Sequence, residues 1–122
     1  MNILFAGCRH SHIMGLYNMA KENPDVNIVG CYERDIENSI VANNTEISFN
    51  IDSYEDALKD KTIDAVAIGD YYGIRGKMVI EALGHGKHVI CDKPICTSHK
   101  ELKEIEKLVK KTGLKVSCML DL

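Results

Sequence analysis

The sequence predicts an α/β fold in which a doubly wound, mostly parallel sheet of six strands lies between two layers of helices. Three observations lead to this fold class. Short runs rich in β-branched residues alternate with amphipathic stretches along all 122 residues, as in chains built from strand–helix–strand units. The strand-like runs are almost continuously apolar, which is typical of parallel strands covered on both faces. Right-handed crossovers then give a three-layer, Rossmann-like α/β/α domain.

Six short apolar runs carry the strand signal, and polar or turn-forming residues bound each of them. The first run ends at Gly7, and the second follows the break Asn23-Pro24-Asp25. The fourth run, with the sequence IDAVAI, has a strong signal. We expect strands over residues 2–6, 26–32, 47–49, 63–68, 87–91 and 114–120.

Five stretches have apolar residues at helical spacing, and two of them begin with a recognisable cap. Ser53 is followed by Asp56 three positions later, and Ser98 forms a capping box with Glu101. Gly113 ends the last stretch, in the position typical of a helix stop. We expect helices over residues 10–22, 35–43, 53–59, 74–83 and 98–113.

The composition is that of an ordinary globular protein, with 45% hydrophobic and 27% charged residues. Fifteen basic and 18 acidic residues give a net charge of −3, which argues against a nucleic-acid or anionic-membrane partner. No apolar run approaches the ~20 residues of a membrane span, and the first residues are unlike a signal peptide. The five cysteines form no CxxC pair, so we expect reduced thiols in a cytoplasmic protein rather than disulfides or a metal site.

Ligands of a doubly wound sheet bind beyond the carboxyl ends of the strands, where the strand order reverses. Four loops follow predicted strands at that edge, and all are rich in polar residues. They cover residues 7–12, 32–35, 69–73 and 92–96.

The first loop is where the phosphate fingerprint G-x-G-x-x-G belongs, and here it reads GCRHSH from Gly7 to His12. Gly7 permits the tight turn, whereas Arg9 and His12 replace the other two glycines. Either Arg9 contacts a phosphate together with the helix N-terminus, or both side chains fill the space of a dinucleotide. His10 and His12 do not share a face, and no third ligand is spaced to join them, so we expect no metal site.

The second loop carries Glu33, which lies 26 residues after Gly7. An acid near this spacing accepts the ribose hydroxyls of a dinucleotide and repels a 2′-phosphate, so it favours NAD over NADP. Arg34 keeps NADP open, because an arginine there can pair with the 2′-phosphate. The simpler alternative is a solvated charged turn.

The fourth loop begins with Asp92-Lys93-Pro94, directly after a strand that we expect to be buried. A carboxylate and an ammonium at a strand end can serve positioning, proton transfer or the binding of a substrate hydroxyl. The alternative is a surface turn.

From end to end, the chain resembles the N-terminal domain of the glucose–fructose oxidoreductase / inositol dehydrogenase (Gfo/Idh/MocA) family. The resemblance rests on the Gly7 turn, on segments 63–68 and 81–89, and on Asp92-Lys93-Pro94, which is similar to the family's Glu-Lys-Pro motif. It implies hydride transfer between a nicotinamide and a sugar, polyol or related substrate. It also implies that Lys93 is catalytic, beside nicotinamide and substrate, and that Pro94 is a cis-proline.

The chain departs from the family pattern after the fourth strand as well as in the first loop. Asp70-Tyr71-Tyr72 stands where the family has Thr-Pro-Asn, and Gly73 and Arg75 replace the histidines that usually follow. Tyr71 and Tyr72 can stack on an adenine or nicotinamide ring, or they can cap an empty site. The residues expected to bind the cofactor are Gly7, Arg9, His10, Ser11, His12, Glu33, Arg34, Gly69, Asp70, Tyr71, Asp92, Lys93 and Pro94.

We expect residues 1–122 to form a single NAD(P)-binding domain. The family's enzymes add a second domain that holds most of the substrate pocket, so these residues alone should bind the dinucleotide without turnover of a small-molecule substrate. One alternative is a stand-alone nucleotide-binding or sensor module that prefers another nucleotide, such as a CoA-type ligand. Another is a scaffold that dimerises through an apolar patch near the sixth strand. The sequence leaves a homo-oligomer open.

Overall fold

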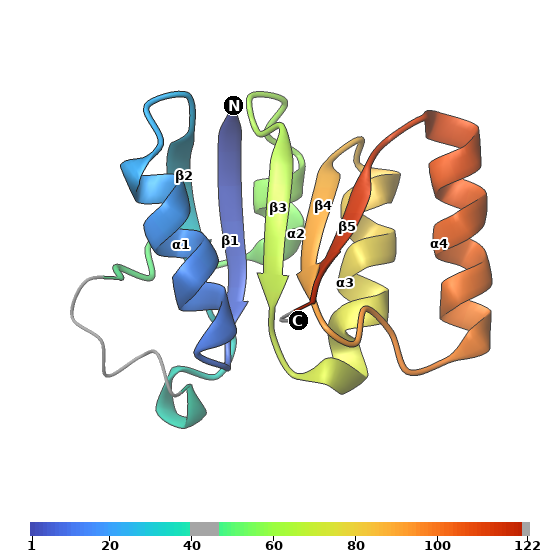
Figure 1. The fold of residues 1–122 in the computed structure, drawn as a ribbon, viewed down its shortest axis with the longest axis horizontal. Helices are drawn as coiled ribbons and strands as arrows, with labels where there is room; N and C mark the ends of the chain where they lie inside the picture. The colour runs from blue at the N-terminus through green and yellow to red at the C-terminus, as the bar shows by residue number, and fades with distance from the viewer. Residues whose placement is uncertain (40–46, 121–122) are drawn as a thin grey trace.

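The computed structural model describes residues 1–39 and 47–120, within which five strands form one parallel sheet (Figure 1). The sheet has the order β2-β1-β3-β4-β5, and every neighbouring pair is parallel. Its strands are β1 (Asn2–Cys8), β2 (Asn27–Tyr32), β3 (Ala65–Gly69), β4 (His88–Asp92) and β5 (Val116–Met119). Because β1 lies between β2 and β3, the strand order reverses at β1, and the doubly wound prediction is confirmed.

Helices cover both faces of the sheet, as the prediction of three layers requires. α1 (His12–Glu22) lies on the front face, over β1 and β2 (Figure 1). The other helices lie behind the sheet, where α4 packs beside α3. They are α2 (Tyr54–Leu58), α3 (Tyr72–Gly84) and α4 (His99–Thr112). Among the described residues, none of the helices is both long and apolar enough to span a lipid bilayer.

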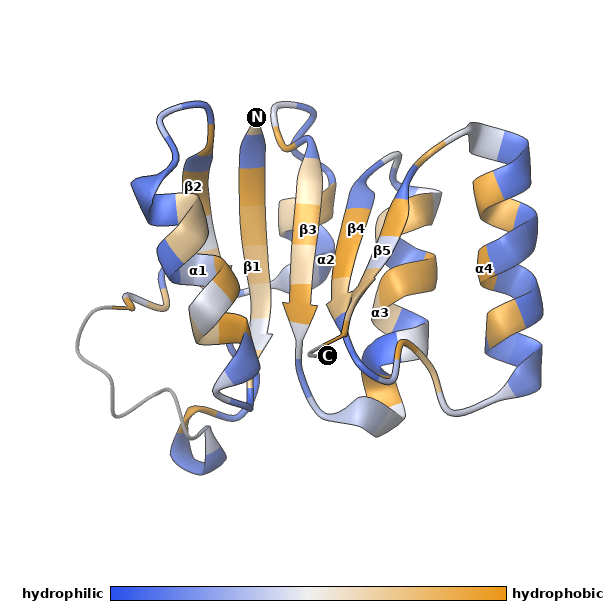
Figure 2. Cartoon of the chain, viewed as in Figure 1, coloured by the Kyte–Doolittle hydropathy of each residue, from blue (hydrophilic) through white to orange (hydrophobic). Residues whose placement is uncertain are grey.

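The side chains of β1 alternate between two apolar layers and so divide the core. Ile3 and Phe5 pack with Ile13 of α1 in the front layer, whereas Leu4 and Ala6 join the layer formed with α2, α3 and α4. All four β1 side chains are at most 1% exposed. By contrast, α4 has one apolar face: Figure 2 shows its hydrophobic residues turned toward α3 and its hydrophilic ones turned outward. The continuous apolar run of β1 therefore reflects burial on both sides.

Both predicted serine caps are present, whereas the Glu101 Oε2 of the expected capping box has no hydrogen-bond partner among the described residues. The Ser53 Oγ accepts a hydrogen bond from the Asp56 amide at 3.2 Å, and the Ser98 Oγ accepts one from the Lys100 amide at 3.1 Å. Gly113 ends α4 in the left-handed conformation, with φ of 72°. These contacts satisfy amides and carbonyls that a helix end leaves without partners.

Of the six predicted strands, the third in chain order, over residues 47–49, is not a strand in the structure, so that prediction is wrong. On the side of β2 that faces away from β1, the described residues form a single parallel bridge, between Tyr32 and Ile51. The Asn50 side chain accepts a hydrogen bond from the Cys31 amide at 3.0 Å, and the amides of Asn50 and Ile51 donate to the Cys31 carbonyl at 3.1 and 3.2 Å. Ile51 also fills the space beside Gly30, where an added Cβ would lie 2.7 Å from Ile51 Cγ1. These contacts with β2 thus come from Asn50 and Ile51, just after the predicted run, and residues 47–49 are not a strand.

The helix predicted over residues 35–43 is shorter in its described part. Only a 3₁₀ turn over Ile36–Asn38 is present there, and residues 40–43 lie outside the described residues. The Asp35 side chain accepts hydrogen bonds from Asn38 and caps this turn.

A buried lysine fastens the amino-terminal edge of the sheet, at the start of β4. Lys87 is only 4% exposed, and its Nζ donates to the carbonyl oxygens of Asp60 at 2.5 Å and Ile63 at 2.9 Å. These carbonyls belong to the turn that leads into β3. The ammonium therefore connects two segments that enter neighbouring strands.

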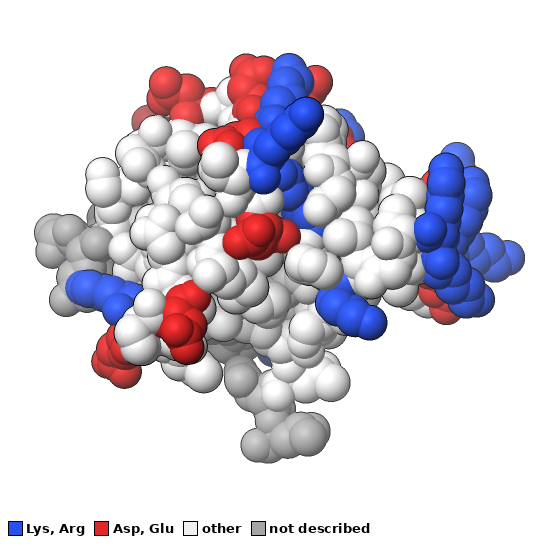
Figure 3. All heavy atoms as spheres, turned by 90° about the horizontal axis from the view of Figure 1, so that it is seen from above, with Lys and Arg blue, Asp and Glu red and all other residues white. Residues whose placement is uncertain are grey.

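Charged residues are unevenly distributed over α4. Figure 3 looks onto the amino-terminal edge of the sheet and shows lysines gathered on one side of the molecule. On α4 a shallow depression is lined by Lys103, Glu106, Lys107, Lys110 and Lys111. This lysine row lies on α4, away from the loops that follow β1, β2 and β3 (Figure 1).

Candidate functional site

The four loops singled out in the sequence follow β1, β2, β3 and β4, and they meet at the carboxyl edge of the sheet. Because all these strands are parallel, each one delivers its loop to the same edge. Contacts between the loops join residues more than 20 positions apart, as between Cys8 and Glu33 or between Arg9 and Asp35. The structure therefore brings most of the predicted site residues together.

Gly7 makes the closest approach between the first and third loops. Its φ is +76°, in the left-handed region that favours glycine. An added Cβ would lie 2.3 Å from the Asp70 Cβ and 2.6 Å from its Cα. The Arg9 amide donates to the Gly69 carbonyl at 3.1 Å and holds the two loops in this arrangement. The glycine that the fingerprint keeps is thus the one for which no side chain has room.

Glu33 is buried, although it follows directly after β2. Its Oε2 accepts a hydrogen bond from the Cys8 amide at 2.6 Å, and its Oε1 accepts one from the Asp35 amide at 2.9 Å. The carboxylate therefore joins the loop after β2 to the loop after β1 and places a negative charge beside the Gly7 turn. The neighbouring Arg34 is exposed.

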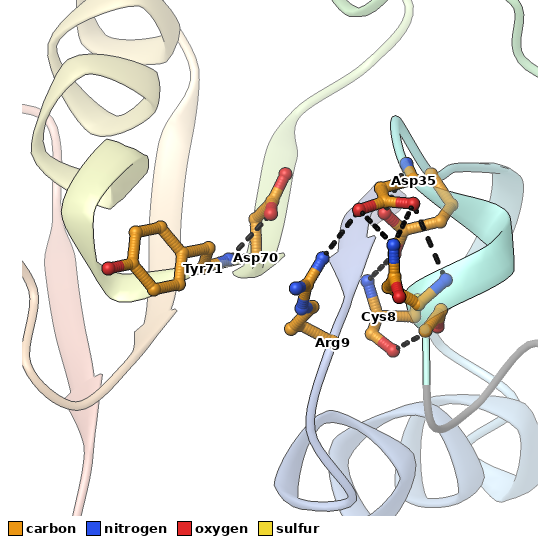
Figure 4. A network of polar contacts seen from close by, with 8 residues as sticks. Cys8, Arg9, Asp35, Asp70 and Tyr71 are labelled. Atoms are coloured by element: carbon orange, nitrogen blue, oxygen red, sulfur yellow. Dashed lines mark hydrogen bonds and ion pairs between the residues drawn. The ribbon is translucent and has the colours of Figure 1, made fainter.

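Arg9 reaches across the edge of the sheet toward the loop after β2. Its Nη1 lies 2.9 Å from the Asp35 Oδ2, and both side chains are partly exposed (Figure 4). The hydrogen bond from Asn38 and the pairing with Arg9 lower the pKa of Asp35 below its usual value. A cation is therefore held beside the Gly7 turn by a carboxylate that remains charged near neutral pH.

Arg75 is the central residue of a polar network between the third and fourth loops. Its side chain is 1% exposed, and its Nη2 donates to the Asp92 Oδ2 at 2.9 Å. Its Nε donates to the Asp70 carbonyl at 2.6 Å, and its Nη1 donates to the Lys93 carbonyl. One guanidinium therefore binds the backbone or side chain of three residues that end strands or begin loops.

The predicted Asp92-Lys93-Pro94 motif lies at the carboxyl end of β4. The Asp92 Oδ1 accepts a hydrogen bond from the Lys93 amide at 2.8 Å, and the Lys93–Pro94 bond is cis, as the resemblance implied. Both the amide and the carbonyl of Lys93 are hydrogen-bonded, whereas its side chain is exposed. The backbone of Lys93 is therefore fixed, and its ammonium lies at the surface of the site.

The first loop contains two histidines, His10 and His12. The His12 Nδ1 lies 3.4 Å from the Asp92 Oδ1, so this ring extends from α1 toward the fourth loop. His10 is half-buried, and Ser11 is the N-cap residue of α1. Within residues 1–39 and 47–120, no group of three or more histidine, cysteine or acidic side chains could hold a metal ion.

Asp70 is buried at the end of β3, and its two carboxylate oxygens differ. The Oδ1 accepts a hydrogen bond from the Tyr71 amide at 2.5 Å (Figure 4). The Oδ2 is buried and has no hydrogen-bond partner among the described residues. The next residues, Tyr71 and Tyr72, are exposed, and their ring centroids lie 4.3 Å apart. A buried acid and an exposed pair of aromatic rings thus stand side by side along the chain.

Asp70 also lines a cavity of about 190 Å³ between the ends of β2 and β3 and the helices α2 and α3. Two tyrosines, Tyr32 and Tyr54, contribute aromatic walls, and their ring centroids lie 5.9 Å apart. The lining residues are Tyr32, Arg34, Tyr54, Asp70, Ile74, Lys77, Met78 and Glu81.

The cysteines are all free thiols, and three of them are buried. Burial raises the pKa of Cys31 to about 11 and that of Cys91 to about 12, and it raises the pKa of Cys8 as well. Protonated thiols of this kind behave as small apolar side chains. The prediction of unpaired thiols is confirmed.

Comparison with known proteins gives the family. A family model described as "Oxidoreductase family, NAD-binding Rossmann fold" matches residues 1–120. The chain belongs to the Gfo/Idh/MocA oxidoreductase family. Membership confirms the resemblance seen in the sequence and identifies the described fold as an NAD-binding Rossmann domain.

Two curated relatives of this Gfo/Idh/MocA domain are dehydrogenases. Trans-1,2-dihydrobenzene-1,2-diol dehydrogenase of Xenopus tropicalis is 29% identical over 82 residues, which are 66% of this chain and 25% of that protein. The scyllo-inositol 2-dehydrogenase (NAD(+)) of Bacillus subtilis is 40% identical over 63 residues, 52% of this chain and 18% of that protein. The chain thus spans about a quarter or less of the length of these relatives.

A solved structure has the same fold as this Gfo/Idh/MocA domain. The myo-inositol 2-dehydrogenase of Lactobacillus plantarum superimposes with a TM-score of 0.78 at 20% identity. The match covers 98% of this chain and 36% of that chain. At this identity the likeness concerns the fold alone.

Arg75 is the residue of this Gfo/Idh/MocA site whose role sequence reasoning missed. In the sequence, Arg75 stands out only as the replacement for a histidine of the family pattern. A signal was present, because Arg75 lies three positions before Met78 and four before Val79, on the apolar stripe of α3. A charge on a buried stripe requires a partner, but the partner, Asp92, could be identified only from the fold.

Proposed function

We propose that residues 1–122 bind NAD at the carboxyl edge of the sheet, as the cofactor-binding domain of a hydride-transferring oxidoreductase. The observation that carries this proposal is the left-handed turn at Gly7, packed against Asp70 without room for a side chain. In a doubly wound fold, such a turn lets the diphosphate of a dinucleotide approach the backbone before the first helix. Membership of an NAD-binding family supports the same ligand.

The residues beside the turn fit a diphosphate. Ser11, the N-cap residue of α1, makes no capping hydrogen bond with its side chain, so this helix start favours an anion. The Arg9 guanidinium is partly exposed beside it, and a guanidinium can bind phosphate oxygens in pairs. Of the two interpretations of Arg9, we therefore propose the phosphate contact. His10 and His12 would flank the same loop.

For the adenosine half we propose NAD rather than NADP. Glu33 and Asp35 place two carboxylates at the end of β2, and their negative charge disfavours a 2′-phosphate on the ribose. The buried carboxylate of Glu33 supports the loop that would hold the ribose, and we propose that it keeps its predicted role toward the hydroxyls. Arg34 is exposed and is the residue through which NADP would bind instead.

Lys93 is the proposed catalytic residue. When bound, a nicotinamide supplies the carbon that accepts or donates hydride. The hydrogen bonds to the Lys93 amide and carbonyl fix the backbone at this point. The exposed ammonium can then donate a hydrogen bond to the oxygen of a substrate hydroxyl and orient it.

The substrate class that we propose is a cyclic polyol or a related sugar. The names of two relatives describe rings that carry neighbouring hydroxyls, an inositol and a dihydrobenzenediol. We propose that the substrate pocket is completed by a second domain, because these relatives are several times longer than the segment they share with this chain. Residues 1–122 then supply the cofactor-binding site and Lys93, and they do not turn over substrate by themselves.

A titration with NADH, followed by the cofactor's own fluorescence, tests the proposal. The chain has no tryptophan, so the protein contributes little background. We expect saturable enhancement, with NADH bound more tightly than NADPH. The variant Lys59→Ala removes an exposed cation at the end of α2, outside the predicted site, and as a control it should leave NADH binding unchanged. Saturation by NADPH alone would transfer the ribose role to Arg34, and no binding at millimolar NADH would overturn the proposal.

A further inference from the structure

We propose that the Asp70 carboxylate recognises the 6-amino group of the cofactor's adenine. The inference rests on the proposed function, since it assigns the base of the proposed dinucleotide to the cavity beside Asp70. It makes Asp70 a specificity-determining residue for the base of the cofactor, separate from the residues that hold diphosphate and ribose.

Asp70 has one engaged and one unused carboxylate oxygen among the described residues. The residue is only 1% exposed, and its Oδ1 is engaged by the Tyr71 amide. Its Oδ2 is turned away from that amide (Figure 4) and has no partner within the described part of the chain. A buried carboxylate oxygen without a donor is costly. A ligand that donates a hydrogen bond there removes this cost, so the site favours a donor over an acceptor.

The cavity beside Asp70 is small and partly lined by aromatic and apolar side chains. Its volume of about 190 Å³ is several times the ~30 Å³ share of one water molecule. It is smaller than the roughly 300 Å³ at which pockets for drug-sized ligands begin. The space therefore suits one flat ring system rather than a whole dinucleotide. Tyr32, Ile74 and Met78 provide aromatic and apolar walls for such a ring.

The cavity adjoins the turn at which we propose that the ribose binds. Tyr32 and Arg34, which lie on either side of Glu33 in the sequence, both line the cavity. For a ribose bound at this turn, the cavity is therefore a neighbouring site in which the attached base could lie. Of the hydrogen-bonding groups on an adenine ring, the exocyclic amine is the donor that a carboxylate can accept. Asp70, on the opposite side of the cavity from Tyr32 along the sheet order, then reads that amine.

The test compares NADH with its hypoxanthine analogue, in which a carbonyl oxygen replaces the 6-amino group. The wild-type chain is titrated with both cofactors by fluorescence. We expect NADH to bind at least about tenfold more tightly, since hydrogen bonds to charged groups are the strong ones and a facing carbonyl is repelled. Equal affinity for the two would overturn this inference and leave the proposed function intact. If neither cofactor binds, the proposed function itself fails.

The variant Asp70→Asn assigns the preference to the residue. The amide keeps an oxygen for the Tyr71 N–H and gains an NH₂ group that can donate to the hypoxanthine carbonyl, so the preference for NADH should fall to about threefold or less. The matched control is Asp25→Asn, the same change at an exposed acid beyond the other edge of the sheet, which should keep the full preference. A full preference in Asp70→Asn would show that another group reads the base. Competition between adenosine and inosine monophosphates for the wild-type chain supplies the same comparison without any variant.

Discussion

The guanidinium of Arg75 and the carboxylate of Asp92 meet at 2.9 Å, and each side chain is no more than 2% exposed. The pair joins α3 to the end of β4. It also supports the two backbone groups of Lys93, one through each partner. An ion pair buried in this way gives the proposed catalytic lysine a rigid attachment to the sheet.

Removal of the guanidinium is expected to destabilise the domain strongly. In Arg75→Met the Asp92 carboxylate stays buried without its cation, and the free energy of unfolding should fall by about 3–5 kcal/mol. Arg75→Lys should lie in between, because an ammonium keeps the charge but lacks the planar fork of donors that reaches three separate groups. Urea denaturation measures both. Lys77→Met, an exposed cation on the same helix, is the control, and a loss below 1 kcal/mol in Arg75→Met would contradict the role given to the pair.

Two glycines should respond to alanine in opposite directions. In Gly7→Ala the new Cβ meets the Asp70 backbone in a left-handed conformation, so we expect a loss of about 2 kcal/mol or more. Gly15 lies inside α1 with nothing within 4 Å of an added Cβ, and Gly15→Ala should stabilise the domain by about 0.5–1 kcal/mol. Thermal unfolding of the two variants gives the comparison. Similar midpoints for both would show that the Gly7 turn has more freedom than the structure indicates.

Asp35 is expected to compete with the cofactor for Arg9. Arg9→Ala should weaken NADH binding roughly tenfold, as for the loss of a charge-assisted contact. Asp35→Asn frees the guanidinium and should strengthen binding, while the double variant should match Arg9→Ala. Fluorescence titration at low and high salt measures all three. Arg9→Gly decides between the two interpretations of the loop, because tighter binding in that variant would mean that the arginine only fills space.

Stability should decline at alkaline pH because of the buried thiols. The pKa of Cys31 rises from its usual 9.0 to about 11, and that of Cys91 rises to about 12. Between pH 9 and pH 12 the unfolded chain loses these protons while the folded chain keeps them, so the free energy of unfolding falls as pH rises. Burial raises the pKa of Tyr54 too, which acts in the same direction.

Urea unfolding under reducing conditions at pH 7.5 and pH 10.5 measures this decline. A double variant, Cys31→Ala with Cys91→Ala, should lose less stability between the two pH values than the wild type. A wild-type chain that is equally stable at both would show that these thiols titrate normally in the fold.

The fold could be predicted because its signals are local. Continuous apolar runs such as β1 and capping residues such as Ser98 act within a few positions of the chain, and both were identified correctly. The strand over residues 47–49 failed for a physical reason. The contacts with β2 come from Asn50 and Ile51, just after the apolar run, and one of them uses the Asn50 side chain, which leaves no periodic trace in the sequence.

The site was predictable as an edge of the sheet but not as a set of contacts. Parallel strands deliver their loops to one edge, so Gly7, Glu33 and Lys93 were all expected there. The sequence does not show that Glu33 turns inward to two amides, or that Arg75 finds Asp92. Both depend on partners brought together only by the complete sheet. The cofactor roles of these residues stay predictions until they are measured.

The opposite edge of the sheet contains a built-in reporter. The Lys87 ammonium is enclosed by the carbonyls of Asp60 and Ile63, so an amine-acylating reagent can reach it only when the start of β4 separates from the turn before β3. Exposed lysines such as Lys59 should be modified at once. The rate at which Lys87 is acylated, read by mass spectrometry, therefore reports how often this edge of the sheet opens. No probe needs to be attached to the cofactor edge.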